Sequence, residues 1–209
     1  MKHQQHRNPV LLVHGIFRQS GVFRKMEEDL RRRGWSAYAL NLSLNNFNFG
    51  IEELAREVAD YVDRTFPPEQ PFDLVGLSMG GIVSRYYMQR LGGIERVQRF
   101  ITLSAPHHGT WMAYALRRPT CVQMRPNSDL LADLNRDATL LERVNFTSIW
   151  TDWDFIIVPA SSSQMSVGKQ VKLPVFAHAM MVRHRKSLQA VVQALETPVA
   201  DKCGVSRLN

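Results

Sequence analysis

The stretch FDLVGLSMGG, residues 72–81, decides the fold, because a buried apolar run leads straight into a glycine-flanked serine and then into a helical pattern. Ser78 stands at the centre of a G-x-S-x-G pattern, between Gly76 and Gly80. A strand-to-helix turn this sharp has no room for side chains beside the serine, and it exposes the hydroxyl above the sheet. The stretch therefore predicts a nucleophilic serine; the alternative is a glycine-rich turn with an incidental serine.

Strand and helix patterns alternate on both sides of this turn. Strands are expected at residues 10–13, 35–42, 72–77, 97–103, 146–151 and 175–177. Helices are expected at residues 22–33, 51–62, 79–91 and 188–195, with Ser20 as the cap of the first. This alternation predicts an α/β fold with about six mainly parallel strands and helices on both faces, in a single domain over residues 1–209.

Residues 105–145 break the alternation with three prolines and short amphipathic pieces, which predicts a small helical insertion, or cap, after the fourth strand. Two interpretations of its apolar side chains stay open. In the first they line a substrate cavity, with Trp111 and Met112 as substrate-binding residues together with Phe17 from the loop after the first strand. In the second they pack short helices against one another.

A serine hydroxyl needs a base to take its proton, and the base needs an acid to orient it. His178 is the expected base because it ends the sixth expected strand, at the same edge of the sheet as the serine. His184 lies among basic residues, where a solvated side chain is favoured. Asp154 follows the fifth strand and is the expected acid, with Asp152 as the fallback. The alternative for His178 is a histidine with a purely structural role, and the alternative for either aspartate is a carboxylate that stabilises a turn.

The oxyanion of the intermediate needs hydrogen-bond donors. The backbone N–H of Met79, directly after the serine, is one candidate. The second is the N–H of Ile16, in the loop after the first strand, where Gly15 allows close backbone approach. His14 is expected to order this loop by hydrogen bonding, or to be a half-buried histidine without a functional contact.

These segments, in this order, resemble the α/β-hydrolase superfamily, and within it the small bacterial triacylglycerol lipases and related esterases. The matching segments are NPVLLVHGI (8–16), DLVGLSMGG (73–81), LSAPHHGT (103–110), TSIWTDWD (147–154) and VFAH (175–178). The resemblance implies the α/β-hydrolase fold, with Asp154 and His178 as triad partners of Ser78 and with Ile16 and Met79 as oxyanion donors.

The sequence departs from the family pattern at two positions. Leu77 stands where many members have histidine, and Ala177 stands where many have glycine. Neither position holds a reacting group. The calcium site of larger lipases does not map onto this chain, and the adjacent pair His107 and His108 lacks further ligands at metal-site spacing. We therefore expect no metal and no cofactor.

The expected function is a serine hydrolase that cleaves carboxylic (acyl or lipid) esters through an acyl-enzyme. The substrate would be a small-molecule or lipid ester. One alternative is a deacylase or acyltransferase of the same fold that acts on phospholipids or lipid-linked groups. Another is a non-catalytic binding protein on a hydrolase scaffold, which would predict a damaged triad.

The charge is +7, from 26 Lys and Arg against 19 Asp and Glu, and the excess sits in residues 1–35 and 165–209. Nucleic acid is not favoured as a partner, because no basic stretch interleaved with aromatic residues and no zinc pattern is present. Peripheral contact with an anionic membrane is a better explanation. Since most expected reacting groups fall outside the basic ends, we expect those ends not to form the active site.

The first residues are polar, and no segment reaches the length of a membrane span, which predicts a cytoplasmic protein with peripheral membrane contact as an option. Cys121 and Cys203 are the two cysteines of the sequence. Free thiols are expected, and one bridge between them stays open.

Overall fold

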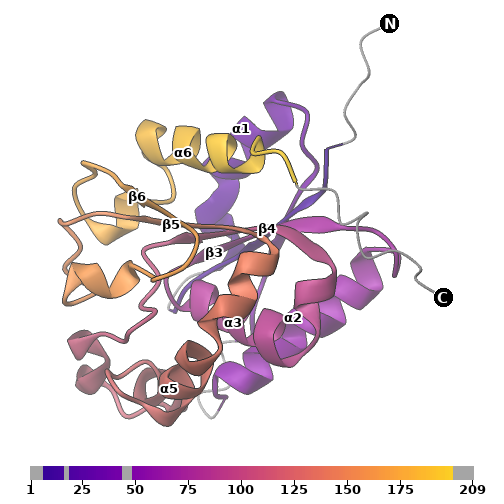
Figure 1. The fold of residues 1–209 in the computed structure, drawn as a ribbon. Helices are drawn as coiled ribbons and strands as arrows, with labels where there is room; N and C mark the ends of the chain where they lie inside the picture. Colours follow the sequence, from indigo (N-terminus) through magenta and orange to yellow (C-terminus); the bar gives the residue numbers. More distant parts are fainter. Residues whose placement is uncertain (1–6, 17–18, 44–48, 200–209) are drawn as a thin grey trace, which may run out of the picture.

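A computed structural model describes residues 7–16, 19–43 and 49–199 of the chain. Within them, six strands form one sheet in the order β2-β1-β3-β4-β5-β6, with every neighbouring pair parallel. The strands are β1 (Val10–Val13), β2 (Ala37–Leu40), β3 (Phe72–Leu77), β4 (Val97–Leu103), β5 (Asn145–Trp150) and β6 (Lys169–Lys172). Parallel pairing makes all six strands end at one edge, on the left in Figure 1.

Helices cover both faces of the sheet (Figure 1). One face carries α1 (Arg24–Arg32) and α6 (Arg185–Leu195), and the other carries α2 (Ile51–Thr65) and α3 (Met79–Arg90). Two short helices, α4 (Pro119–Gln123) and α5 (Asp129–Arg136), belong to the segment after β4. The 3-10 turns are η1 (Ser20–Phe23), η2 (Gly93–Glu95), η3 (Trp111–Ala115), η4 (Ala138–Arg143), η5 (Ala160–Ser163) and η6 (His178–Met180). None of the helices in the described residues combines the length and apolarity that a membrane crossing requires.

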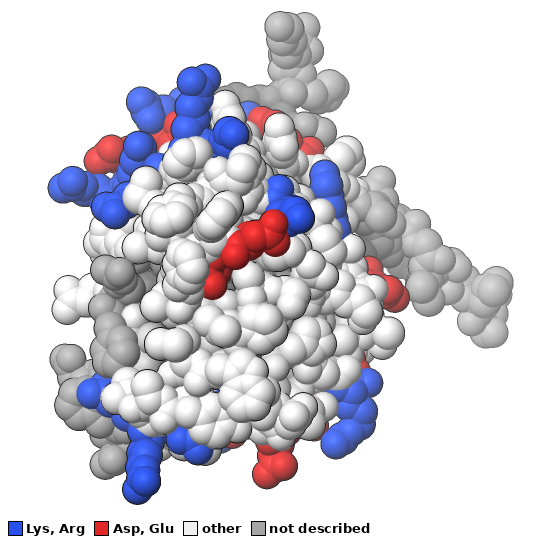
Figure 2. All heavy atoms as spheres, turned by 90° about the vertical axis from the view of Figure 1, so that its left-hand side faces the viewer, with Lys and Arg blue, Asp and Glu red and all other residues white. Residues whose placement is uncertain are grey.

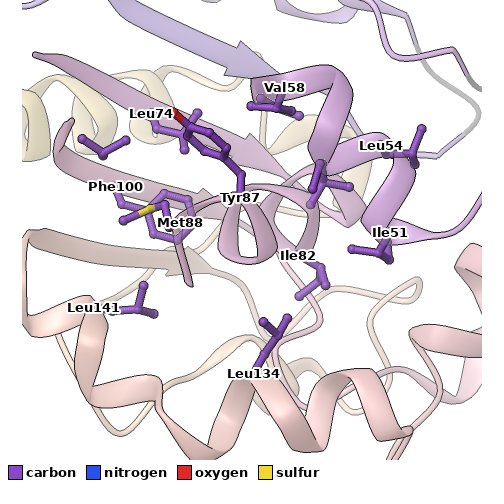
Figure 3. Close-up of a cluster of buried hydrophobic side chains, with 14 of the residues drawn as sticks. Ile51, Leu54, Val58, Leu74, Ile82, Tyr87, Met88, Phe100, Leu134 and Leu141 are labelled. Carbon is purple, nitrogen blue, oxygen red and sulfur yellow. The ribbon is translucent and has the colours of Figure 1, made fainter. Parts of the chain in front are cut away.

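The core is divided by the sheet into two apolar clusters. Alternate residues of β1 face opposite ways, so that Leu11 and Val13 join the cluster under α2 and α3 while Val10 and Leu12 join the cluster under α1 and α6. Burial on both faces explains why β1 is apolar throughout, as in other parallel sheets. Figure 3 shows part of the first cluster, where Leu134 from α5 lies near side chains of α2 and α3.

The expected six-stranded α/β architecture is confirmed, and β3 and β4 have the expected bounds. The sixth expected strand, 175–177, is wrong: β6 lies at Lys169–Lys172, and Phe176 is 67% exposed. An edge strand needs only one partner and little burial, so β6 is polar and has no hydrophobic pattern to reveal it.

The sequence also led to expectations about a helix cap at Ser20 and about the two cysteines. The expected side-chain cap at Ser20 is wrong, because Ser20 begins η1 and its backbone N–H donates to Asn41 Oδ1 at 2.6 Å. Cys121 is buried in α4, whereas Cys203 lies outside the described residues.

The segment 105–145 is helical, and buried polar contacts fix its helix α5 to α3. Arg85 of α3 is fully buried, and its guanidinium donates to the Leu134 carbonyl at 2.7 Å and to Asn135 Oδ1 at 3.0 Å. Gln89 donates to the same carbonyl at 2.8 Å. Burial lowers the pKa of Arg85 to about 9, so the cation is costly to hold there. Arg85 and Gln89 thus satisfy the Leu134 carbonyl, one of the last carbonyl groups of α5, which lack donor partners within the helix.

Candidate active site

Ser78 occupies the sharp turn between β3 and α3. Its backbone is left-handed (φ 55°, ψ −125°), which costs energy for a residue with a side chain. A Cβ at Gly80 would lie 2.2 Å from the Val13 carbonyl oxygen, and one at Gly76 would lie 2.6 Å from the Cα of Gly81. Contacts this short with backbone cannot be relieved by moving a side chain, so the turn requires glycine at both positions.

Partly buried His178 and buried Asp154 form a hydrogen-bonded pair. The Nδ1 atom of His178 lies 2.7 Å from Asp154 Oδ2, and the aspartate side chain is 1% exposed. A carboxylate can only accept, so Nδ1 carries the proton, which leaves Nε2 as the free acceptor. The other oxygen of Asp154 accepts from the N–H groups of Ile156 at 3.0 Å and Ile157 at 2.9 Å.

The pKa of Asp154 is set by opposing effects. Burial alone would raise this pKa, but the hydrogen bond and charge of His178 and the two backbone donors outweigh burial and hold it below its ordinary value. Asp154 is therefore ionised at neutral pH, as a group that orients a histidine must be.

The two alternative residues lie elsewhere. Asp152 is exposed and forms an ion pair with Lys172 at 3.2 Å. His184 precedes α6, where its Nδ1 accepts from the backbone N–H of Lys186 at 3.2 Å. The structure brings Asp154, and not Asp152, together with His178.

Ala177, directly before His178, has a left-handed φ of 73° and a ψ of 142°. This region is almost restricted to glycine, and an alanine there costs about 1–3 kcal/mol. Replacing Ala177 with glycine removes this strain, although the extra freedom of the unfolded chain offsets part of the gain. We expect Ala177→Gly to raise the free energy of unfolding by about 1 kcal/mol.

Thermal unfolding measures this effect, which corresponds to an increase in Tm of roughly 2–4 °C for a chain of this size. Ala179→Gly is the matched control, because Ala179 lies within η6 and gains nothing from a left-handed conformation. That control should lose about 0.5–1 kcal/mol. Equal destabilisation by both variants would contradict the strain at Ala177.

The loop after β1 passes close against the nucleophile. A Cβ at Gly15 would lie 2.9 Å from the Cβ of Ser78, so only glycine allows this approach. His14 is buried and holds the loop as expected: its Nδ1 donates to the Gly15 carbonyl at 2.9 Å and its Nε2 accepts from the N–H of Leu42 at 3.0 Å. Burial lowers the pKa of His14, which favours the neutral ring that these two bonds require.

Thr110, which is not among the residues expected from the sequence, positions the loop that carries Asp154. Its Oγ1 donates to the Ile156 carbonyl at 2.7 Å and accepts from the N–H of Val158 at 2.9 Å. One hydroxyl therefore holds the loop directly behind the acid. Its signal was available, because Thr110 closes the LSAPHHGT segment on which the family resemblance partly rests.

A cavity of about 1470 Å³ lies at the edge where β1, β2 and β3 end, and both Ser78 and His178 line it. Ile16, an expected oxyanion donor, also lines it, whereas the Met79 side chain is fully buried below the turn. The other described lining residues are Gly15, Gln19, Gly21, Val22, Arg24, Lys25, Asn41, Leu42, Ser43, Phe49, Leu54, Leu77, Arg118, Thr120, Ile156, Ala179, Val182 and Arg183.

The expected substrate-binding residues do not gather at this cavity. Trp111 and Met112 are 59% and 48% exposed and are not part of its lining, and Phe17 lies outside the described residues. Arg118 and Thr120 are the residues through which the segment 105–145 reaches the cavity. The leucines of α5, Leu130, Leu131 and Leu134, are buried in the core instead, because they have the i, i+3 and i+4 spacing that packs a helix onto a neighbour.

The pair His107 and His108 has two different environments. His107 is fully buried, and its Nε2 lies 3.0 Å from Thr102 Oγ1. His108 is exposed and lies 3.4 Å from the side-chain amide of Asn135. Adjacent residues that face apart in this way cannot share one metal ion.

Comparison with solved structures shows the same fold in lipases. Over 90% of this chain and 92% of the other, it is similar to the mature form of lipase BlEst2 from Bacillus licheniformis, with a TM-score of 0.74 and 14% identity. Aspergillus fumigatus lipase B gives a TM-score of 0.79 at 19% identity, over 94% of this chain and 54% of that lipase. Phospholipase PlaB from Legionella pneumophila gives a TM-score of 0.60 at 16% identity, over 68% of this chain and 37% of that enzyme.

The comparison with protein families is more specific than these structural likenesses. The model of the palmitoyl protein thioesterase family matches residues 9–153, which is more than half of the chain and includes the turn at Ser78. With its six-stranded parallel sheet, this chain therefore has the expected α/β-hydrolase fold and belongs to the palmitoyl protein thioesterase family.

Proposed function

We propose that this protein is a serine hydrolase that cleaves acyl esters or thioesters through Ser78, His178 and Asp154. The observation that carries the proposal is the pairing of His178 with buried Asp154 at 2.7 Å, with the histidine and the strained serine lining one cavity. This combination of nucleophile, base and orienting acid is what acyl transfer requires.

Each residue has one part in the proposed reaction. The Nε2 atom of His178 takes the proton of the Ser78 hydroxyl as Oγ attacks the acyl carbon. Asp154 holds the tautomer and stabilises the imidazolium that forms. The proton then passes to the leaving alcohol or thiol, and an acyl-enzyme remains. Water, deprotonated by the same histidine, attacks the acyl group and restores the serine.

The backbone N–H groups of Ile16 and Met79 are the proposed oxyanion donors. Met79 is the first residue of α3, so its N–H has no acceptor within the helix. The close approach of Gly15 to Ser78 brings the neighbouring Ile16 to the same cavity. Donors fixed in this way stabilise the developing negative charge without reorganisation during the reaction.

The proposed substrate has an acyl chain. The family name includes palmitoyl thioesters, and several similar structures are lipases. In this chain, Leu42, Phe49 and Leu54 give one wall of the cavity an apolar lining that suits hydrocarbon. The alternative of a phospholipid deacylase or acyltransferase uses the same residues, and product analysis with and without an added alcohol separates hydrolysis from transfer. A non-catalytic binding protein would not need the buried acid and histidine.

A fluorophosphonate probe tests the nucleophile. Such a probe should form one covalent adduct, in which the serine oxygen bonds to phosphorus and fluoride leaves. Mass spectrometry of the peptides should place the adduct on Ser78, and prior incubation with an acyl substrate should slow labelling. An intact, folded protein that does not react, or an adduct on another serine, would refute the proposal.

A further inference from the structure

The charged side chains around the cavity have one sign. Its described lining includes four cations, Arg24, Lys25, Arg118 and Arg183, and no aspartate or glutamate. Asp154 lies behind His178 and is 1% exposed, so its charge is directed to the histidine. A cleft lined by one sign of charge concentrates the opposite ion.

Three of these cations lie on the same side. Arg24 and Lys25 begin α1, and Arg183 stands two residues before α6, the helix that packs against α1. Val22 and Val182 beside them belong to the cluster on that face of the sheet. These three side chains form what we call the cationic wall: Arg24, Lys25 and Arg183. Within the described residues no carboxylate lies at ion-pair distance from any of them.

This arrangement corrects an expectation from the charge distribution. The basic ends of the sequence were expected to lie outside the active site, but Arg24 from the first basic segment and Arg183 from the last meet at the cavity. The contact between α1 and α6 brings them together. Figure 2 faces the edge at which the strands end. Most of its lysines and arginines lie toward the upper left and the lower margin of a largely uncharged surface, and an acidic group with a basic neighbour lies near the centre.

The opposite side of the cavity carries apolar side chains. Arg118, the fourth lining cation, directly precedes α4, which contacts α2. Leu54 lies in the first turn of α2, and Phe49 lies two residues before that helix. Both belong with the cluster on the α2 face. Ser78 stands between this side and the cationic wall, at the end of β3. A substrate with its reacting carbon at Ser78 would thus suit the cavity best if one end were a hydrocarbon chain and the other end were negatively charged.

We propose that the cationic wall binds a phosphate group in the alcohol or thiol part of the substrate. Because this rests on the proposed function, it narrows the substrate to an acyl ester or thioester whose leaving group is phosphorylated. The acyl chain would lie along Phe49 and Leu54. The phosphate could belong to a lipid head group or to a soluble phosphorylated thiol, and its recognition by arginine and lysine would be the same.

Two matched pairs of substrates test this. The oxyester pair is 1-octanoylglycerol and its 3-phosphate; the thioester pair is S-octanoyl-N-acetylcysteamine and octanoyl-coenzyme A. In at least one pair, the phosphorylated member should have a kcat/KM at least about ten-fold higher at low salt, and sodium chloride should reduce that ratio. A preference in the first pair identifies a lipid head group, and one in the second a soluble thioester. No preference in either pair refutes the proposal.

Variants assign the preference to the wall. In the triple variant Arg24→Gln, Lys25→Gln and Arg183→Gln, the kcat/KM ratio of phosphorylated to neutral substrate should fall to near one. The control removes the same charge from exposed positions outside the cavity lining, through Arg64→Gln, Arg136→Gln and Lys169→Gln. It should keep the ratio. Equal ratios in the two triple variants would overturn the proposal.

A binding measurement separates this proposal from the hydrolytic function. Octyl phosphate and octanol carry the same chain and have no bond to hydrolyse. Calorimetry should show that octyl phosphate binds to Ser78→Ala protein at least about ten-fold more tightly than octanol. Equal binding would refute the phosphate site even if esters are cleaved. Failure of the protein to cleave any of the four substrates would refute the hydrolytic function instead.

Discussion

Replacing Ser78 with alanine should lower kcat for an octanoyl ester by about 10⁶-fold, as loss of the nucleophile does in serine hydrolases. The variant should still fold, because alanine removes only the hydroxyl from the strained turn. The small rate that remains would come from the oxyanion donors and from substrate positioning. Initial rates with a chromogenic octanoyl ester, together with the probe labelling described above, measure the loss.

Ser84→Ala is the control for this substitution. Ser84 lies on the same helix, α3, and its buried hydroxyl has no hydrogen-bond partner among the residues that the structure describes. Removing that hydroxyl leaves no group unpaired, so activity and stability should stay close to wild type. A Ser78→Ala protein that keeps more than about 1% of wild-type activity would show that another nucleophile carries the reaction, since residual rates in such variants are far smaller.

Replacing Asp154 with asparagine should lower kcat by about 10⁴-fold while leaving the fold intact. Asparagine matches the carboxylate in shape, and its oxygen can still accept from the N–H groups of Ile156 and Ile157. Toward His178, however, the amide donates, which places the imidazole proton on Nε2, where it blocks removal of the serine proton. The loss should therefore fall on kcat more than on KM.

Asp152→Asn tests whether the effect belongs to position 154. Asp152 is separated from Asp154 by one residue, but it is exposed and its carboxylate bonds to Lys172. Exposed ion pairs contribute little, so this variant should stay within about two-fold of wild type. A large loss at Asp152 with a small loss at Asp154 would reassign the acid.

The sequence predicted the central elements because their burial leaves a pattern. β3 and β4 are buried nearly throughout, and the glycines at the Ser78 turn are required by backbone contacts that any side chain would violate. The expected pair of His178 and Asp154 lies together in the structure. The pair could be expected because a histidine and an aspartate near the ends of expected strands should meet at the same edge of the sheet, and both the residue types and those positions can be read from the sequence.

What the sequence did not predict depends on contacts between distant segments. β6 is a polar edge strand, and the apolar run before His178 is interrupted by the left-handed backbone at Ala177. Trp111 was expected to bind substrate because it is a large apolar residue in the segment 105–145. In the structure it is exposed and does not line the cavity. The cationic wall contains residues about 160 positions apart in the sequence. No local sequence pattern predicts that they lie on the same side of the cavity, because this depends on the topology of the fold.

The buried guanidinium of Arg85 has a consequence for attempts to re-engineer this chain. Two of its acceptors, the Leu134 carbonyl and the Asn135 side chain, come from α5. Deleting or exchanging residues 105–145 would remove both of these oxygen acceptors and leave the buried cation only Gln89 Oε1 and the Met165 sulfur. The cost would be about 3–5 kcal/mol, comparable to the loss of one partner of a buried ion pair. Transplanting the corresponding segment from a relative would therefore require a helix end that presents a carbonyl group at the same place, or a simultaneous Arg85→Leu or Arg85→Met substitution.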